Sequence, residues 1–543
     1  MRKHIPMPYS LPHRHYSSGF SCIRRTRLGS LALATLLFAV GAASSQAADR
    51  AKTTEEKVLF PFDDNSLPFN KGLLLTLVPG RKSVANHGTG FDVAHPNKPV
   101  VPIGKTGDPD FPRAYFLGTV IKIGDQYRMW YTGWDEDKQR QVCYAISTDG
   151  INWEKPKLGL VNYRGNTQNN LVQLDGSGSK EGVGTYGNGS MRGASAWVLY
   201  EPEDPNPERR FKMIREVTPS QNLAAFSADG LKWKSMSPDS VIQGSGLEPS
   251  GLIKFNGCYY LNGHGGPIPH PVPGARKRMM VTFASYDFEN WTRAGHVSFR
   301  RDPLPPRAPQ SFSGHEGEQI HQGASLWDRG NVILGFYGQY HNSTNDRRTS
   351  TCDLGLVISS DAVHFKEPIP DFKILPAYEE DDGAEARLTQ GQGFENIGDR
   401  TVLYYGIWTA QVPDGPTGVR IATWERDRLG YFSPAPEITE AHCISTPIKV
   451  SAGSRVFVNV DGLSAKSRIS VELLDEQFRP IPGYSGADCV PLENSGLRQV
   501  VAWKGKESLE TMDGVVRVRI NWMGDRPGDA RLYSVYVTPA GWD

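Results

Sequence analysis

Short runs of β-branched and aromatic residues, bounded by turn residues, dominate most of the chain. Tyr127–Tyr131 and Val142–Ile146 are two such runs. Gly124-Asp125 precedes the first run, and Asp149-Gly150 follows the second as in a hairpin connection. Because apolar residues rarely recur at helical spacing, this pattern predicts an all-β fold.

The runs pair into hairpins, each with a first strand, a turn containing Gly, Asp or Pro, and a second strand. The predicted first strands are Tyr115–Ile123, Ser195–Tyr200, Ser250–Phe255, Ala324–Asp328 and Gly393–Ile397. The predicted second strands are Tyr127–Tyr131, Phe211–Ile214, Tyr259–Asn262, Val332–Tyr337 and Thr401–Tyr405. Five hairpins of this kind indicate five repeated units.

A short phrase, S-x-D-x-x-x-W or F, occurs four times, each time after strand-like runs. The copies are Ser147–Trp153, Ser227–Trp233, Ser285–Trp291 and Ser359–Phe365, and they start 80, 58 and 74 residues apart. Repeats of this length, filled with short strands, are typical of four-stranded propeller blades. We therefore predict a five-bladed β-propeller over residues 48–440, and we interpret the phrase as a turn with an aromatic wedge between blades.

The pattern of hydrophobic and polar residues changes near residue 441. Alternating runs such as Arg455–Val460, Ile469–Leu474 and Val515–Ile520 predict antiparallel strands, and about 100 residues suit a small β-sandwich. Residues 441–543 are therefore predicted to form an accessory β-sandwich. Packing against the propeller is the favoured role for it, and sugar binding by its aromatic residues is the alternative.

The first 47 residues have the composition of a secretory signal with an extended leader. Arg24, Arg25 and Arg27 form a basic segment, Leu28–Val40 is apolar, and Ser45–Ala47 offers small residues for cleavage. The apolar run is too short for a comfortable membrane span. We expect a secreted or periplasmic protein.

Charge and cysteine content exclude several classes of partner and site. Lys and Arg number 60 against 59 Asp and Glu, which gives no reason to expect nucleic acid or an anionic membrane as a partner. The cysteines show neither CxxC pairs nor a cluster with histidines at zinc spacing. Cys443 and Cys489 are either a disulfide of the C-terminal region or isolated buried thiols.

Three segments of the first blade carry a resemblance to known enzymes. Tyr127–Gly133, Cys143–Trp153 and Gly159–Asn170 resemble the five-bladed propeller glycosidases, the superfamily of glycoside hydrolase families 32, 43 and 68. Val471–Gly483 and Leu532–Ser534 resemble the β-sandwich of an uncharacterised secreted bacterial branch of that group. The resemblance implies a hydrolase acting on a polysaccharide or oligosaccharide. The W-M-N-D-P-N-G and E-C motifs of the invertase type are absent, so cleavage of fructans is not implied.

Hydrolysis of a glycosidic bond requires two carboxyl groups that flank it. In the resembling families these groups stand on or just before the first strand of a blade. Asp110, Glu248 and Glu318 precede the first strands of blades one, three and four, and are the predicted catalytic residues. Their structural alternatives are an Asp-Pro turn, a rim or capping carboxylate and a solvated loop, respectively.

Other polar and aromatic residues near the first strands are candidates for binding sugar. They are Arg113, Arg192, His321, Glu316, Gln390, Gln392 and Trp134. Core packing is the commoner fate of a propeller tryptophan such as Trp134, Trp130 or Trp408. The predicted chemistry requires no cofactor and no catalytic metal. The acidic run at 379–382 is a candidate for structural Ca²⁺, although a solvated loop is the simpler interpretation.

Other functions remain compatible with this pattern, because fold does not determine function. A propeller that only binds glycans is expected if Glu248 and Glu318 do not share a pocket. A sugar phosphorylase needs a cationic cluster in the channel, for which Arg113, Arg192 and Arg387 are the candidates; a lyase and a structural surface module are further alternatives. The sequence specifies neither the sugar and linkage nor the oligomeric state.

Overall fold

The computed structural model describes the chain from residue 56 onward, apart from several loops. The described residues are 56–86, 90–92, 99–137, 139–174, 195–218, 221–237, 241–242, 246–266, 278–301, 319–341, 351–379, 384–385, 387–408, 418–438, 440–510 and 512–542. They contain 35 strands and two short 3₁₀ turns, which confirms the all-β prediction. Within these ranges no helix is long and apolar enough to cross a membrane.

Some predicted features lie outside the described residues. They are the secretory signal at 1–47, Arg192, Glu316 and Glu318, and the side chains of the acidic run at 379–382. In the part of the chain that the structure does describe, no group of three or more His, Cys, Asp or Glu residues is placed to hold a metal ion.

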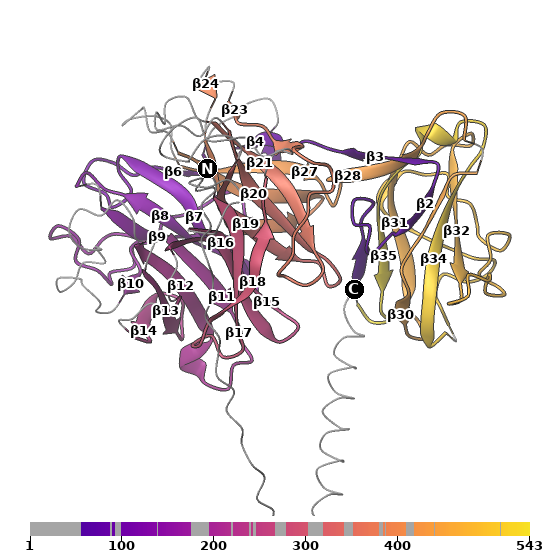
Figure 1. Cartoon of the computed structure of the whole chain (residues 1–543). Helices are drawn as coiled ribbons and strands as arrows, with labels where there is room; N and C mark the ends of the chain where they lie inside the picture. Colours follow the sequence, from indigo (N-terminus) through magenta and orange to yellow (C-terminus); the bar gives the residue numbers. More distant parts are fainter. Residues whose placement is uncertain are drawn as a thin grey trace, which may run out of the picture. The chain divides into compact units, whose positions relative to one another are not determined.

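Five groups of antiparallel strands correspond to the five predicted repeats (Figure 1). The groups of blades one and five are joined into one sheet, because β25 pairs with β7 in parallel. Blade one contains β7 (Arg113–Ile123), β8 (Gln126–Trp134) and β9 (Arg140–Ser147). Blade two contains β11 (Ser195–Tyr200), β12 (Phe211–Thr218), β13 (Gln221–Ser227) and β14 (Lys232–Ser235). Blade three contains β15 (Gly246–Phe255), β16 (Cys258–Gly266), β17 (Met279–Ser285) and β18 (Thr292–Phe299). Blade four contains β19 (Gln319–Asp328), β20 (Ile333–His341), β21 (Thr351–Ser359) and β22 (Lys373–Leu375); blade five contains β25 (Leu388–Ile397), β26 (Arg400–Ile407) and β27 (Gly418–Glu425).

The first strands of the five sheets form a closed ring. Strand β7 contacts β11, β11 contacts β15, β15 contacts β19, β19 contacts β25, and β25 returns to β7. An outer strand of blade five comes from the N-terminal side, because β4 (Arg81–Asn86) pairs with β27. Blades that are consecutive in sequence and in space, with a strand from the other end completing the ring, form a five-bladed β-propeller. The structure therefore confirms the predicted fold.

The repeated phrase forms the same turn in all four copies. The serine hydroxyl accepts from two backbone N–H groups of the turn, and one aspartate oxygen accepts from the N–H groups two and three residues further on. The residue after the aspartate has a positive φ, which Gly150 and Gly230 adopt without strain. Phe288 and Ala362 adopt it in the other two copies. These bonds confirm the turn that was predicted for the phrase.

Asp287 provides a test of this turn. Burial acts to raise the pKa of Asp287, but hydrogen bonds from the backbone and side chain of Asn290 prevail and lower that pKa to about 2. We expect Asp287→Ala to lower the free energy of unfolding by about 1 kcal/mol at pH 7, as does the loss of a comparable cap.

The expected pH dependence follows from the lowered pKa. The stabilisation by Asp287 is complete above the unfolded pKa of about 3.9 and is lost as the pH falls towards the folded value. Urea denaturation at pH 7 and at pH 3 measures the free energy of unfolding of wild type and of Asp287→Ala. The difference between the two proteins should be smaller at pH 3. An equal difference at the two pH values would mean that the ionised carboxylate does not stabilise the turn.

Two further sheets form a β-sandwich around a shared apolar core that includes Val458, Trp503 and Trp522. One sheet contains β1 (Lys57–Leu59), β3 (Leu73–Leu77), β28 (Gly430–Pro434), β31 (Arg455–Asp461), β33 (Gly496–Val500) and β35 (Arg531–Thr538). The other contains β2 (Phe69–Lys71), β29 (His442–Ile444), β30 (Ile448–Val450), β32 (Arg468–Leu474) and β34 (Gly514–Met523). The sequence assigned residues 48–440 to the propeller, whereas β1, β2, β3 and β28 pair with sandwich strands.

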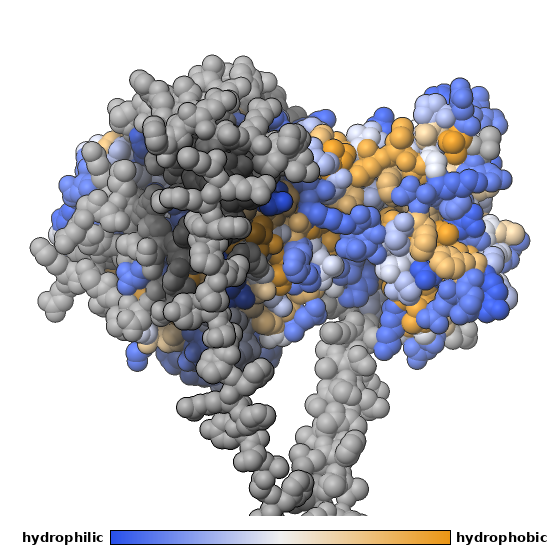
Figure 2. Space-filling model, in the orientation of Figure 1, coloured by the Kyte–Doolittle hydropathy of each residue, from blue (hydrophilic) through white to orange (hydrophobic). Residues whose placement is uncertain are grey.

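The sandwich surface is mixed in character. Figure 2 shows apolar surface among polar residues over these strands, and the exposed large apolar side chains of the chain include Phe69, Leu74 and Phe478. Phe69 and Phe478 meet edge to face, with ring centroids 5.3 Å apart.

Cys443 and Cys489 are both buried free thiols, as are Cys143 and Cys352, so the alternative of a disulfide between the first two is wrong.

A buried ionic cluster joins blade four, blade five and the sandwich. The carboxylate of Asp427, in the turn after β27, is fully buried and forms an ion pair with Arg329 from the turn between β19 and β20. Asp427 also accepts hydrogen bonds from Asn396 in β25 at 3.0 Å and from the hydroxyl of Tyr536 in β35 at 2.8 Å. All the partners of this charge belong to segments distant in sequence, so the cluster depends on the assembled fold.

Candidate active site

Irregular pairing distinguishes the first strands of four blades. The register of β7, β15, β19 and β25 against the second strand of the same blade shifts partway along each strand. In β19 the shift falls at Gln322 and Gly323, which both have positive φ angles, of 67° and 101°. Bulges of this kind re-aim side chains next to functional sites, and residues beside them point into one pocket.

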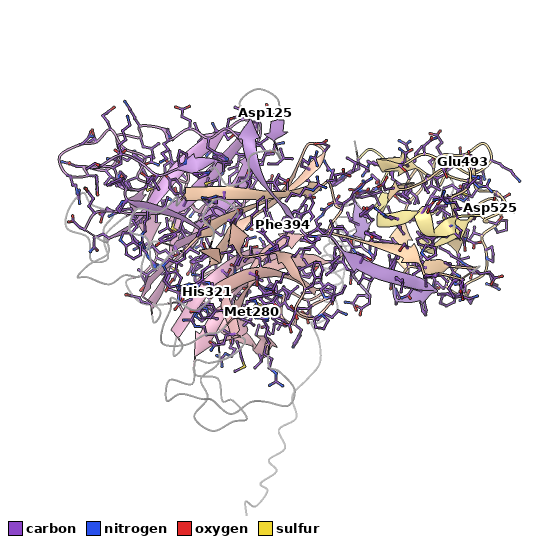
Figure 3. The ribbon with its side chains drawn as sticks, turned by 90° about the horizontal axis from the view of Figure 1, so that it is seen from above. Asp125, Met280, His321, Phe394, Glu493 and Asp525 are labelled. Atoms are coloured by element: carbon purple, nitrogen blue, oxygen red, sulfur yellow. The ribbon has the colours of Figure 1, made fainter. Side chains whose placement is uncertain are left out.

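The pocket receives side chains from all five blades. Its cavity volume is about 110 Å³, and its lining consists of Tyr115, Leu117, Trp134, Arg140, Glu216, Glu248, Arg278, His321, Gln322, Thr389 and Trp408. A concave site with aromatic walls and a few convergent polar groups is typical of sites for small organic ligands. His321 of β19 is labelled in Figure 3, where it lies at the same end of the propeller as Met280 of β17.

Two carboxyl groups line this pocket from adjacent blades. Glu216 lies near the end of β12 in blade two and is 4 % exposed. Glu248 lies near the start of β15 in blade three, with 18 % of its side chain exposed. Two carboxyl groups that face one cavity match the requirement of glycoside hydrolysis.

A histidine connects Glu248 to the bulge in β19. Nδ1 of His264, in β16, accepts a hydrogen bond of 2.8 Å from the backbone N–H of Gln322. Because a nitrogen that accepts carries no proton, the neutral ring keeps its proton on Nε2. That nitrogen lies 3.5 Å from Oε2 of Glu248. The bulge therefore fixes the tautomer of His264, and His264 turns a donor towards Glu248.

We expect His264→Ala to lower kcat on any substrate by about tenfold to hundredfold, the range for losing a hydrogen bond to a charged group. KM should change little, and the acidic limb of the kcat–pH profile should move to higher pH. His264→Gln, which can restore a donor near Glu248, should recover part of the loss. A variant with unchanged kcat and an unmoved profile would exclude this positioning role.

His321 is among the most buried ionisable groups in the pocket. It is 2 % exposed, and its ring stacks at 5.8 Å on that of Trp408. Burial, followed by the positive charge of Arg278, lowers the pKa of His321 well below its usual value. The ring is therefore neutral at pH 7, with one nitrogen able to donate and the other to accept.

Several buried polar atoms of the lining lack a partner within the described part of the chain. They are Nδ1 of His321, Oε1 of Gln322, Oγ1 of Thr389 and Nε of Arg140. Buried polar atoms are nearly always hydrogen-bonded in proteins. Unsatisfied groups beside the indole rings that line the cavity suit a ligand with an apolar face and a rim of hydroxyl groups, as a sugar has.

Positive charge gathers around the two tryptophans of the pocket. The guanidinium groups of Arg113 and Arg140 each lie 5.5 Å from the ring of Trp134, and that of Arg387 lies 5.4 Å from the ring of Trp408. Arg278 lines the pocket directly and contacts the ring of Tyr340. Two members of this cationic cluster, Arg113 and Arg387, are among the candidates that the sequence suggested.

Three predicted site residues meet in this pocket: Glu248, His321 and Trp134. Arg113 lies beside it, against Trp134. Asp110 lies elsewhere, since it is 1 % exposed and accepts hydrogen bonds from the hydroxyl of Tyr131 at 2.7 Å and from Lys155 at 2.5 Å. The geometry gives Asp110 a structural environment and adds no support for its predicted catalytic role.

The two predicted glutamines connect strands instead of lining the pocket. Gln390 donates to the carbonyl oxygens of His321 at 3.1 Å and Gly323 at 2.8 Å. Gln392 accepts from the N–H groups of Leu252 and Leu326. Both amides thereby tie blade five to neighbouring first strands, a role that depends on contacts remote in sequence.

Glu216, Arg140 and Arg278 were not predicted from the sequence. Glu216 lies near the end of a second strand, whereas Arg140 begins a third strand and Arg278 directly precedes one. In an antiparallel blade, the end of the second strand and the start of the third lie at the same edge as the start of the first. A search for charged residues at these three places of each repeat would therefore have found Glu216, Arg140 and Arg278.

No protein-family model matches the chain, and no curated protein matches its sequence. The solved structures to which it is similar include several glycoside hydrolases.

Three of these structures illustrate the similarity. A member of the GH130 family of mannoside phosphorylases, which contains glycoside hydrolases that target β-1,2 mannosidic linkages in Candida mannan, is 12 % identical, with 65 % of this chain and 95 % of that chain covered and a TM-score of 0.38. A glycosyl hydrolase from Bacteroides ovatus is 12 % identical, with 69 % and 95 % covered and a TM-score of 0.37. A thermostable family-43 glycoside hydrolase is 13 % identical, with 60 % and 91 % covered and a TM-score of 0.35. At such values the similarity does not identify the reaction.

Proposed function

We propose that this protein is a secreted glycoside hydrolase that cleaves a polysaccharide or oligosaccharide in the propeller pocket. The observation that carries the proposal is that Glu216 and Glu248, from adjacent blades, line one cavity together with Trp134 and Trp408. Indole rings stack on the apolar faces of sugars, and the two carboxyl groups supply the acid and the base or nucleophile. No metal or cofactor is required for this reaction.

The surroundings of the two carboxyl groups suggest their roles. The donor that His264 turns towards Glu248 suits a carboxylate that attacks the sugar or activates water. Glu216, the more buried group, is then the acid that protonates the leaving oxygen. The transition state resembles an oxocarbenium ion, so a carboxylate at Glu248 also stabilises its positive charge.

Turnover by the mature protein on plant and algal polysaccharides and aryl glycosides tests the proposal. We expect release of reducing sugar by the wild type and by Glu203→Gln, a matched control whose side chain is exposed in blade two. Glu216→Gln and Glu248→Gln should release reducing sugar at least about a hundredfold more slowly. Retained glycan binding without turnover by any protein would instead indicate a propeller that only binds glycans.

Phosphorolysis is a second candidate, favoured by Arg140 and Arg278 in the pocket. A phosphorylase replaces the attacking water with inorganic phosphate and requires cationic groups to hold it. Addition of phosphate to the assays distinguishes the two reactions, because phosphorolysis yields a sugar 1-phosphate. Secretion is a separate part of the proposal, and fractionation of the producing cells tests it.

A further inference from the structure

The charge of the pocket suggests what kind of sugar it takes. Arg140 and Arg278 both line the cavity, and neither forms an ion pair within the described part of the chain. The Nε atom of Arg140 is also buried without a hydrogen-bond partner. A guanidinium group is charged at every physiological pH, so a partly buried one without a carboxylate partner favours an anionic ligand.

The positive groups lie beside the stacking surfaces. Arg113 and Arg140 flank the indole ring of Trp134, and Arg387 flanks that of Trp408. A sugar that stacks on either ring would bring its substituents next to these groups. Arg140 and Arg278 therefore line the pocket, and Arg113 and Arg387 lie beside its two tryptophans.

We infer that the substrate is an acidic glycan, in which a sugar unit bears a carboxylate or sulfate group held by Arg140 and Arg278. The inference rests on the proposed function and adds the class of substrate to it. A planar guanidinium forms paired, charge-assisted hydrogen bonds with either oxyanion, which a neutral hydroxymethyl group cannot replace. The neutral His321 and the hydroxyl of Thr389 remain available for uncharged hydroxyl groups.

Matched aryl glycosides provide the first test. Each pair contains a neutral pyranoside and the corresponding uronide or sulfated sugar, in both anomers. We expect kcat/KM to be at least about tenfold higher for the acidic member. Arg140→Gln and Arg278→Gln should lower kcat/KM for the acidic substrate by about tenfold to hundredfold, the value of a charged hydrogen bond, and change it less than about threefold for the neutral one.

A control variant, a variant that retains the charge and thermal melting together separate an effect on the site from damage to the fold. Arg293→Gln removes an exposed guanidinium from β18, in the same blade as Arg278, and should leave both substrates unaffected. Arg278→Lys retains the charge without the planar fork and should lie between wild type and Arg278→Gln. Equal thermal melting of all variants confirms that they are folded. Whether the uronide or the sulfated sugar is preferred identifies the oxyanion.

Two outcomes would overturn the inference while leaving a working enzyme. One is a preference for neutral substrates with no effect of either arginine variant. The other is that inorganic phosphate speeds up the turnover of neutral substrates in the wild type but not in Arg278→Gln. That result would mean that the arginines bind phosphate. If nothing is turned over, calorimetry with uronic-acid oligosaccharides decides: binding that depends on Arg278 supports the inference without the hydrolase, and absence of binding rejects it.

Discussion

Replacing Glu248 with glutamine should lower kcat by about 10²- to 10⁴-fold, the usual contribution of a general acid, base or nucleophile. Glutamine preserves the size of the side chain and its contact with His264 but carries no negative charge. KM should change much less than kcat, because the stacking and hydrogen-bonding groups of the pocket remain. Steady-state kinetics on the best substrate of the panel measures both constants.

Three comparisons make this result specific. Glu216→Gln should produce a loss of similar size, and the double variant should be little worse than either single one, because both groups act in one step. Glu203→Gln should behave as wild type. Equal losses of kcat in all these proteins would point to instability, and wild-type activity in Glu248→Gln would remove Glu248 from the reaction.

Replacing Asp427 with alanine should lower the free energy of unfolding by about 3–5 kcal/mol, the typical cost of breaking a buried ion pair. The substitution leaves the guanidinium of Arg329 buried without its carboxylate, and it removes acceptors for Asn396 and Tyr536. Urea denaturation at pH 7 measures the loss. Asp399→Ala, which changes a carboxylate that is 72 % exposed in a nearby turn, should change the stability by less than about 0.5 kcal/mol.

The same cluster gives wild-type stability a pH dependence. Burial acts to raise the pKa of Asp427, but the charge of Arg329 and the hydrogen bonds hold that pKa below its usual value. The cluster therefore stabilises the fold fully above the unfolded pKa of about 3.9, and this stabilisation is lost as the pH falls through the folded value. The difference in the free energy of unfolding between wild type and Asp427→Ala should become smaller as the pH is lowered. A constant difference would contradict an ionic origin.

The blades were predictable because their signals are local. The turns after Ser147, Ser227, Ser285 and Ser359 are formed by hydrogen bonds within seven residues, so the sequence alone marks them. The pairing of β4 with blade five, and of β1 with β35, joins segments hundreds of residues apart. No local pattern encodes such partners, which is why the division of the N-terminal strands between the two folds was not evident.

The site was predictable in part for the same reason. Glu248 and His321 were found because they stand near first strands, where the resembling enzymes carry their functional groups. Glu216 and Arg278 escaped notice because their position at the pocket emerges only when the order of strands within a blade is considered. Gln390 was assigned to sugar binding, yet its amide bonds to blade four, a contact that only the closed ring creates.

The structure of Glu248→Gln with a bound oligosaccharide would test the central claim most directly. The variant retains the pocket but should not cleave its ligand, so a substrate found by the turnover panel can be observed intact. We predict a sugar stacked on Trp408 or Trp134, with the scissile oxygen between residues 216 and 248 and hydrogen bonds to His321 and Thr389. A sugar bound only outside this pocket, on the sandwich or another face of the propeller, would contradict the account.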